Sequence, residues 1–440
     1  MIKSKTGWQA AMSLSCLLYA TSAEAGHYVV DWQLSEFNNR RDTGSAVVVD
    51  GNDLPYVAGA SGNVYGTGPS LGGQVALVAK YNQAGQRSWL TNAYPTENLD
   101  HVLGMELDSS GNVFIAGETY RYPGAEAFLV KYSGSGSVLW ERHLGTSDNE
   151  FGRDVAVDQF GNSYLLGSTT GLLAGSVNNG YDAFIAKYSP TGALLMLRQY
   201  PQGNATISDI PSAIALDGLD MVVVGTSGAT ASTLTRLAPN GDVIWSVHPN
   251  LATSAGQVTQ LYDVTVDAAG NIYTCGFTDS VYNNAYGFQG SDAVVAKHNA
   301  AGDLIWQRRL TTAGFDSFNA VKVDAFGDVY VAGSYTDATS IIVGEHDAVW
   351  AKFSSSGDLL WQQTYATEHG DYAADIAIDS QRNVYVTGSS SWTVNDYYQG
   401  ERDAYLVRYR YVVPEPSGLL GGLMAVAWVA LRGRVRARAA

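Results

Sequence analysis

Aspartates at repeated positions are the residues of this chain whose type and spacing could most readily do chemistry. Seven of them each follow a short apolar segment and precede a tight turn, and a glycine comes eight or nine residues later. A carboxylate beside such a turn could belong to a calcium loop, but the alternating acidic pattern of those loops is missing. We therefore predict that these carboxylates accept backbone N–H groups of their own turns. The seven are Asp50, Asp108, Asp158, Asp217, Asp267, Asp324 and Asp379.

Three further aspartates, Asp154, Asp263 and Asp375, stand at the start of the predicted innermost strands of three repeats. Carboxylates in a ring could hold a cation, and calcium is the metal that such oxygen ligands suit. The other four repeats have a small residue there, so the ring is incomplete. We therefore favour hydrogen bonds to backbone for these aspartates and predict neither metal nor cofactor, with calcium as the alternative. The small residues are Ala46, Gly104, Ala213 and Ala320.

An eleven-residue motif occurs three times with few changes, as DAFIAKYSPTG at 182–192, DAVVAKHNAAG at 292–302 and DAVWAKFSSSG at 347–357. A motif that recurs in register in every repeat of a fold usually has a structural role and is rarely a set of identical catalytic sites. We expect its lysine to pair with an acid of the next repeat. A tryptophan follows nine residues later in most repeats and is expected to supply apolar area between sheets. Those tryptophans are Trp89, Trp140, Trp245, Trp306 and Trp361, with Met196 in the third repeat.

The elements that position these residues follow from the period of 50 to 59 residues and from four strand-like segments in each repeat. Seven such units predict an all-β fold, a seven-bladed β-propeller of four-stranded blades. The last unit runs out of chain before its fourth strand. Trp32 lies 18 residues before Asp50, as Trp361 lies 18 residues before Asp379. The N-terminal strand is therefore expected to complete the last blade beside residues 404–409 and to close the ring.

Two stretches of the third repeat carry a family resemblance, DVAVDQFGNSYLLGST at 154–169 and YDAFIAKYSPTGALL at 181–195. They resemble the bacterial beta-propeller repeat known as the SBBP repeat. The resemblance extends over about residues 30–411 and implies the propeller fold. It implies no particular function, because propellers host many.

The two ends of the chain are predicted to be targeting signals. Residues 1–25 have Lys3 and Lys5, an apolar stretch and AEA before Gly26, which is typical of a secretory signal peptide. At the other end, an apolar run at 419–431 precedes four arginines; it is short against the roughly 20 residues that span a bilayer. We thus divide the chain into a signal peptide (1–25), a propeller (26–411) and a C-terminal signal (412–440). The C-terminal motif is Pro414, Glu415 and Pro416.

The C-terminal segment resembles the PEP-CTERM sorting signal of Gram-negative bacteria. The resemblance implies export across the inner membrane, transient anchoring there by the short transmembrane segment, and processing by an exosortase, a membrane protease-transpeptidase. The cell surface or the extracellular medium is then the expected location. Residues 26–416 carry 20 basic and 41 acidic side chains, a net charge of −21, which makes nucleic acid a poor partner.

Enzyme motifs are lacking: the chain has no HExxH, P-loop or G-x-S-x-G pattern in a fitting context. The one cysteine expected in the mature chain, Cys275, occupies a position of small buried residues. Two alternatives to a binding protein stay open. One is an enzyme: a polysaccharide lyase or hydrolase using Asp148 with Glu150 or Asp371 with His369, or a quinoprotein, whose repeat the segment 302–306 resembles. The other is a purely structural surface protein.

Function is expected where the repeats disagree, which is in the loops between second and third strands. These share one rim with the connections between blades, here called the loop-rich rim; the short hairpin turns form the tight-turn rim. The loops at 118–125, 168–181, 277–291 and 389–401 are rich in aromatic and amide side chains, which suit carbohydrate or protein contacts. We predict a non-enzymatic binding or scaffolding protein whose partner is an extracellular polysaccharide or an envelope protein. The predicted contact residues are Tyr120, Tyr122, Tyr282, Tyr286, Trp392, Tyr397 and Tyr398.

Overall fold

The structure of the protein is a computed structural model. The structure describes residues 27–36, 42–62, 74–92, 100–121, 123–174, 180–200, 210–227, 231–249, 251, 258–283, 289–312, 314–336, 346–367, 370–391 and 402–412. Residues 28–411 form one compact unit, and residues 1–27 with 412–440 belong to a second one. The predicted signal peptide, the sorting motif Pro414, Glu415 and Pro416, and the apolar run 419–431 lie outside the described residues. Among the residues described, no helix has the length and apolar character to cross a membrane.

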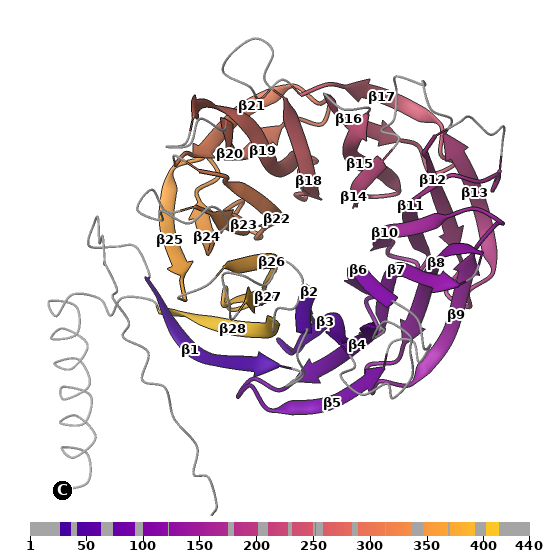
Figure 1. The fold of residues 1–440 in the computed structure, drawn as a ribbon, viewed down its shortest axis with the longest axis horizontal. Coiled ribbons are helices and arrows are strands. Elements are labelled where there is room, and N and C mark those ends of the chain that lie inside the picture. The colour runs from indigo at the N-terminus through magenta and orange to yellow at the C-terminus, as the bar shows by residue number, and fades with distance from the viewer. Residues whose placement is uncertain are drawn as a thin grey trace, which may run out of the picture. The chain divides into compact units, whose positions relative to one another are not determined.

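Seven antiparallel four-stranded sheets are arranged as the blades of a ring (Figure 1), which confirms the predicted fold class. Blades one to three consist of β2 (Asp42–Val49), β3 (Pro55–Gly62), β4 (Gln74–Tyr81), β5 (Arg87–Asn92); β6 (Asp100–Leu107), β7 (Val113–Arg121), β8 (Gly124–Tyr132), β9 (Val138–Leu144); β10 (Glu150–Val157), β11 (Ser163–Thr169), β12 (Asp182–Tyr188), β13 (Leu194–Tyr200). Blades four and five consist of β14 (Ile210–Asp217), β15 (Asp220–Ser227), β16 (Ala231–Leu237), β17 (Val243–Val247); β18 (Thr259–Val266), β19 (Ile272–Asn283), β20 (Gln289–His298), β21 (Leu304–Leu310). Blades six and seven consist of β22 (Ser317–Val323), β23 (Val329–Tyr335), β24 (Asp347–Phe353), β25 (Leu359–Tyr365); β26 (Asp371–Ile378), β27 (Val384–Ser391), β28 (Arg402–Val412) and β1 (His27–Glu36).

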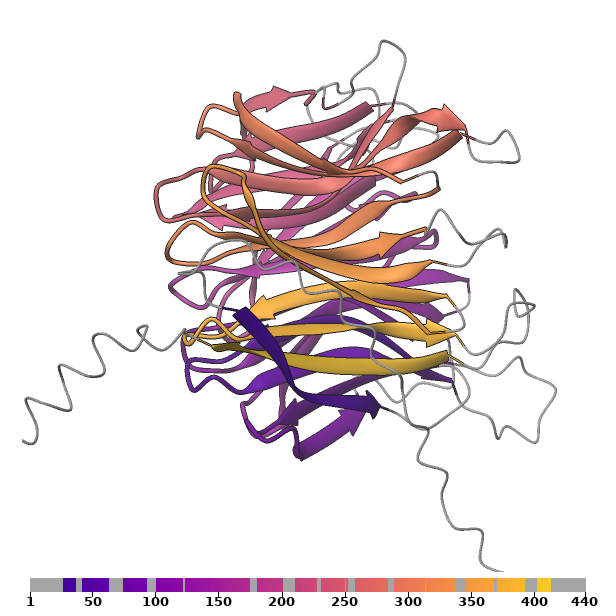
Figure 2. The same ribbon diagram turned by 90° about the vertical axis from the view of Figure 1, so that its left-hand side faces the viewer.

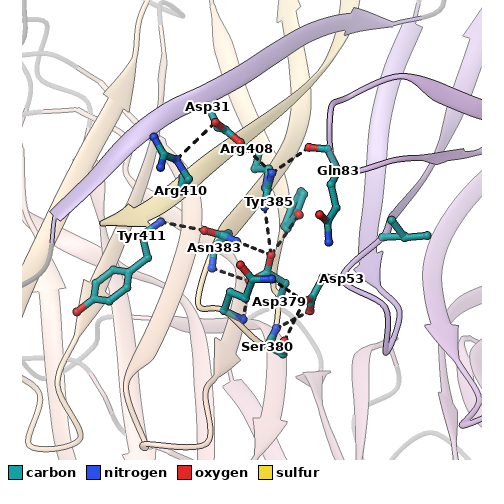
Figure 3. Close-up of polar contacts among 12 residues, drawn as sticks. Asp31, Asp53, Gln83, Asp379, Ser380, Asn383, Tyr385, Arg408, Arg410 and Tyr411 are labelled. Carbon is teal, nitrogen blue, oxygen red and sulfur yellow. Dashed lines mark hydrogen bonds and ion pairs between the residues drawn. The ribbon is translucent and has the colours of Figure 1, made fainter. Parts of the chain in front are cut away.

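The N-terminal strand closes the ring, as predicted. β1 lies outside β28 in the sheet order β1-β28-β27-β26 and so supplies the fourth strand of blade seven. Arg408 holds this seam together: Nη1 lies 2.8 Å from Asp31 Oδ2 and donates to the Gln83 carbonyl of blade one at 2.9 Å (Figure 3). Asp53 of blade one also accepts the Ser380 backbone N–H at 2.8 Å. Closure leaves blade seven hydrogen-bonded along its length instead of presenting an open three-stranded edge.

Tryptophans of the fourth strands fasten each blade to the next. Trp89 donates its indole N–H to the Gly134 carbonyl of blade two at 3.2 Å, and its ring packs on Gly136. Gly136 has φ 87°, and a Cβ there would lie 2.9 Å from the ring, so both the turn and the contact require glycine. Trp32, Trp140 and Trp306 make the same contact with their neighbours. The expectation that the tryptophans fill the space between sheets is confirmed.

The strand-closing aspartates form Asx turns, as predicted. Asp108 Oδ1 accepts the backbone N–H groups of Ser110 and Asn112, both at 2.9 Å. The prediction for the repeated lysines was wrong. Lys131 Nζ lies 3.0 Å from Asp108 Oδ2, an acid of its own blade. Residues two strands apart in one sheet meet here, because the third strand ends at the same rim as the first.

Candidate functional site

An axial channel of about 540 Å³ runs between the innermost strands of the seven blades. Its walls are β2, β6, β10, β14, β18, β22 and β26, which face the centre of the ring in Figure 1. Ligand sites in proteins are commonly concavities of about 300–1,000 Å³. The channel is therefore large enough to admit a small molecule or one group of a larger ligand.

Every innermost strand contains a β-bulge at the same place. In β10, for example, Gly152 pairs with Gly167 and Asp154 pairs with Leu166, so Arg153 is the extra residue between them. Bulges re-aim side chains and are frequent beside functional sites. The seven bulge residues all line the channel, and together they form what we call the bulge ring. Its members are Ser45, Leu103, Arg153, Ser212, Tyr262, Asn319 and Ala374.

The bulge ring lies in the half of the channel nearer the loop-rich rim, because each innermost strand starts at that rim. Unlike the scaffold positions, it differs in chemistry from blade to blade. Arg153 is cationic and lies over the Phe151 ring at 5.3 Å. Tyr262 packs against Phe277 with ring centroids 5.6 Å apart, and burial raises the pKa of its phenol. Asn319 donates to the Ala373 carbonyl of blade seven at 2.9 Å.

The three channel aspartates follow the bulges directly and do not begin their strands, which start four residues earlier. Each accepts one backbone N–H from its own strand and one from the next blade. Asp154 accepts those of Val155 at 2.8 Å and Ile214 at 2.9 Å. Asp263 does the same with Val264 and Val321, and Asp375 with Ile376 and Val47. The interpretation of Asp154, Asp263 and Asp375 as backbone acceptors is confirmed, and they clamp neighbouring blades together.

Lys322 supplies positive charge among these carboxylates. Its Nζ lies 3.7 Å from Asp263 Oδ2. Desolvation alone would lower the pKa of Lys322, but Asp263, Asp375, Glu106 and Asp154 raise it well above its ordinary value. Burial raises the pKa of Asp154 to about 8 and also raises those of Glu106 and Asp375. Within the part of the chain that the structure describes, no three His, Cys, Asp or Glu side chains are grouped so as to hold a metal ion.

Of the predicted rim residues, only Tyr120 has a described side chain. It lies near the end of β7, is 40% exposed, and its hydroxyl donates to Glu118 Oε1 at 3.5 Å. Desolvation and the Glu118 charge raise the pKa of Tyr120. Tyr282 belongs to β19, but its side chain is outside the described residues. Also outside them are Tyr122, Tyr286, Trp392, Tyr397 and Tyr398.

Two of the acids considered for catalysis accept hydrogen bonds from residues in or beside neighbouring loops. Glu150 is fully buried and accepts the Thr146 backbone N–H at 2.6 Å and the Thr169 hydroxyl at 2.7 Å. Asp371 is also fully buried, accepts the Thr367 N–H at 2.6 Å, and has its pKa raised to about 6 by burial. Asp148 is exposed, and His369 lies outside the described residues. Glu150 and Asp371 therefore present no carboxylate to a substrate in solution.

Sequence reasoning missed the bulge ring, Glu106 and Lys322. The available signal was the residue just before each channel position, which is of six different types in the seven repeats, while the residue before it is always small or apolar. A bulge breaks the strict alternation of a strand, so the pattern of inward and outward residues could not be extended through it.

Comparison with family models agrees with the predicted repeat. Residues 140–174 and 363–391 match the family model SBBP, described as a beta-propeller repeat, which confirms the predicted repeat type for these segments. An uncharacterised WD repeat-containing protein of Acanthamoeba polyphaga mimivirus is 20% identical over 389 residues, covering 74% of this chain. The chain spans only 27% of the length of that relative. A crystal structure of a protein of unknown function from Dyadobacter fermentans is 7% identical with a TM-score of 0.47, covering 88% of this chain and 99% of that one.

Proposed function

We propose that this propeller is an exported, non-enzymatic binding or scaffolding protein that holds its ligand at the loop-rich rim, over the mouth of the axial channel. One observation carries the proposal: side-chain variety is concentrated in the bulge ring, at the end of the channel where the variable loops also lie. The turn aspartates and most of the fourth-strand tryptophans, in contrast, recur from blade to blade. Loops and bulges on a rigid scaffold are where proteins commonly place binding residues.

The chemistry of this mouth suits a polar, hydroxyl-rich ligand. Arg153 and Asn319 offer N–H donors, and Tyr262 offers an aromatic ring with a hydroxyl. Tyr120 adds a half-exposed aromatic side chain near the end of β7, at the same rim. We therefore name an extracellular polysaccharide as the partner, and the predicted signal peptide and C-terminal signal support a location at the cell surface. An envelope protein is the alternative partner.

Equilibrium binding to the extracellular polysaccharide of the producing cells tests the proposal, with calcium and with chelator. We expect saturable binding that is weakened by Arg153→Gln and by Tyr262→Ser. Phe160→Ser, which changes an exposed side chain at the tight-turn rim, is the matched control and should bind normally. Absence of saturable binding under both conditions rejects the polysaccharide. Release of unsaturated sugars during the assay would instead identify a lyase.

A further inference from the structure

Exposed apolar pairs begin the outermost strands of five consecutive blades. Leu139, for example, is 51% exposed and Leu195 is 56% exposed. Single exposed leucines are ordinary, so the informative feature is that the pairs recur at one position of successive blades. The pair always stands just before the residue that packs on the next blade. The pairs are Val138 and Leu139, Leu194 and Leu195, Val243 and Ile244, Leu304 and Ile305, and Leu359 and Leu360.

All five pairs lie at the tight-turn rim. Each fourth strand follows a hairpin turn from the third, so its first residues must be at that rim, and Figure 2 shows the short turns gathered on one side of the ring. Three further side chains are exposed on the other turns of this rim: Phe160 at 64%, Phe326 at 71% and Leu219 at 37%. The apolar residues therefore form a broken belt around one rim, which we call the apolar belt. Exposed apolar surface of this extent usually marks an interaction site.

The belt is interrupted at blade one and incomplete at blade seven. Arg87 and Ser88 begin β5 in blade one, and in β1 an exposed Val30 is followed by Asp31 before Trp32. The chain enters and leaves the propeller at this gap: Tyr28 and Tyr411 have ring centroids 5.2 Å apart. The tight-turn rim is thus the rim from which the C-terminal sequence departs.

The segment that links the end of β28 to the C-terminal apolar run is short. Seven residue steps separate Val412 from Leu419, where the 13-residue apolar run begins. A chain of seven residues reaches at most about 25 Å. An apolar run that enters a membrane would accordingly keep the tight-turn rim close to the lipid surface, with the loop-rich rim turned away.

Charge on the rim bears on which lipid it could meet. Its turns combine small residues with aspartates, and Asp242, Asp303 and Asp358 are exposed directly before three of the apolar pairs. The strand-closing carboxylates there are partly neutralised, for example Asp50 by Lys80 at 3.0 Å and Asp108 by Lys131 at 3.0 Å. The net charge of −21 over residues 26–416 disfavours an anionic bilayer, so a neutral lipid surface fits best.

We propose that the tight-turn rim is a lipid-facing surface, on which the apolar belt rests against the neutral bilayer that the predicted C-terminal apolar run enters. This orientation leaves the loop-rich rim and the channel mouth free, but the proposal does not depend on what binds there.

Hydrogen–deuterium exchange on the full chain, with and without phosphatidylcholine vesicles, tests the orientation. We expect exchange to slow several-fold on vesicles at the starts of β9, β13, β17, β21 and β25. The starts of β6 and β14, at the opposite rim, should exchange at the same rate in both samples. A five-fold variant with Leu139→Ser, Leu195→Ser, Ile244→Ser, Ile305→Ser and Leu360→Ser should lose the protection while keeping its melting temperature within a few degrees.

A control variant with Leu103→Ser and Ile210→Ser removes exposed apolar side chains from the opposite rim and should keep the protection. Solution-like exchange at the five strand starts in vesicle-bound chain would overturn the proposal, as would protection of the loop-rich rim instead. Equal protection in lipid-free chain at high protein concentration would also overturn it, because the belt would then contact a second copy. Failure of the full chain to bind the vesicles would do the same.

Discussion

Replacing His298 with phenylalanine should remove an acid-sensitive contribution to stability. His298 ends β20 and is 1% exposed, and its Nε2 lies 3.2 Å from Thr274 Oγ1. The same position holds Phe353 in blade six and Tyr409 in blade seven, so the fold accommodates a six-membered aromatic ring at this position. Burial lowers the pKa of His298 from 6.5 to about 4.

The sign and size of the effect follow from the two pKa values. The unfolded chain protonates this histidine below pH 6.5, whereas the folded protein keeps it neutral until about pH 4. Stability is therefore fully present above pH 6.5 and is lost as the pH falls through this window. At about 1.4 kcal/mol for each pKa unit, the loss reaches about 2 kcal/mol at pH 5 and about 3 kcal/mol at pH 4.

Denaturant unfolding of the native protein and His298→Phe at pH 7.5 and pH 5 measures this loss. The native protein should lose about 2 kcal/mol more than the variant between the two pH values. Other titrating groups, including Asp371 and Asp154, are shared by both proteins and cancel in the difference. Parallel pH profiles for the two proteins would refute the reasoning, since His298 would then not be held neutral by burial.

Three further substitutions test the scaffold. Trp89→Ala removes a partly buried ring and its hydrogen bond to Gly134, and should lower the unfolding free energy by about 2–3 kcal/mol in denaturant titration, whereas the exposed control Phe160→Ser should change it little. Arg408→Met removes the cation of Asp379 and leaves Asp31 with Arg410 alone, and should cost about 3 kcal/mol and speed hydrogen exchange in β1 before the other strands; uniform exchange would contradict the role of Arg408 in closure. Lys322→Met removes the positive charge that faces the channel carboxylates. The melting temperature of the variant should therefore fall further below that of the native protein at pH 8 than at pH 5, where Glu106 and Asp375 are more readily protonated. An equal fall at both pH values would contradict this.

The repeated elements could be predicted because they depend on residue counts and turn chemistry. The spacing from Trp32 to Asp50 equals that from Trp361 to Asp379, and this offset alone indicated that β1 completes blade seven. The Asx turns followed from one carboxylate and its nearest backbone N–H groups, which are local in the chain. The prediction of SBBP repeats rested on the same local patterns.

The partners of the lysines and the bulge ring could not be predicted in the same way. Lys131 meets Asp108 of its own blade because of how the third strand is placed beside the second, which the repeat spacing leaves open. Arg153 became visible as a bulge residue only once the pairing of β10 with β11 was known. The predicted rim tyrosines lie mostly outside the described residues and stay predictions.

By itself the sequence determined the number of blades, their order and the closure of the ring, because period, turn glycines and strand length are properties of consecutive residues. Only the tertiary structure decided that Lys322 lies among carboxylates from four other blades, that seven bulge residues share one channel, and that five apolar pairs share one rim. These arrangements join residues that are about 50 or more positions apart, and their distances depend on how whole blades pack around the axis.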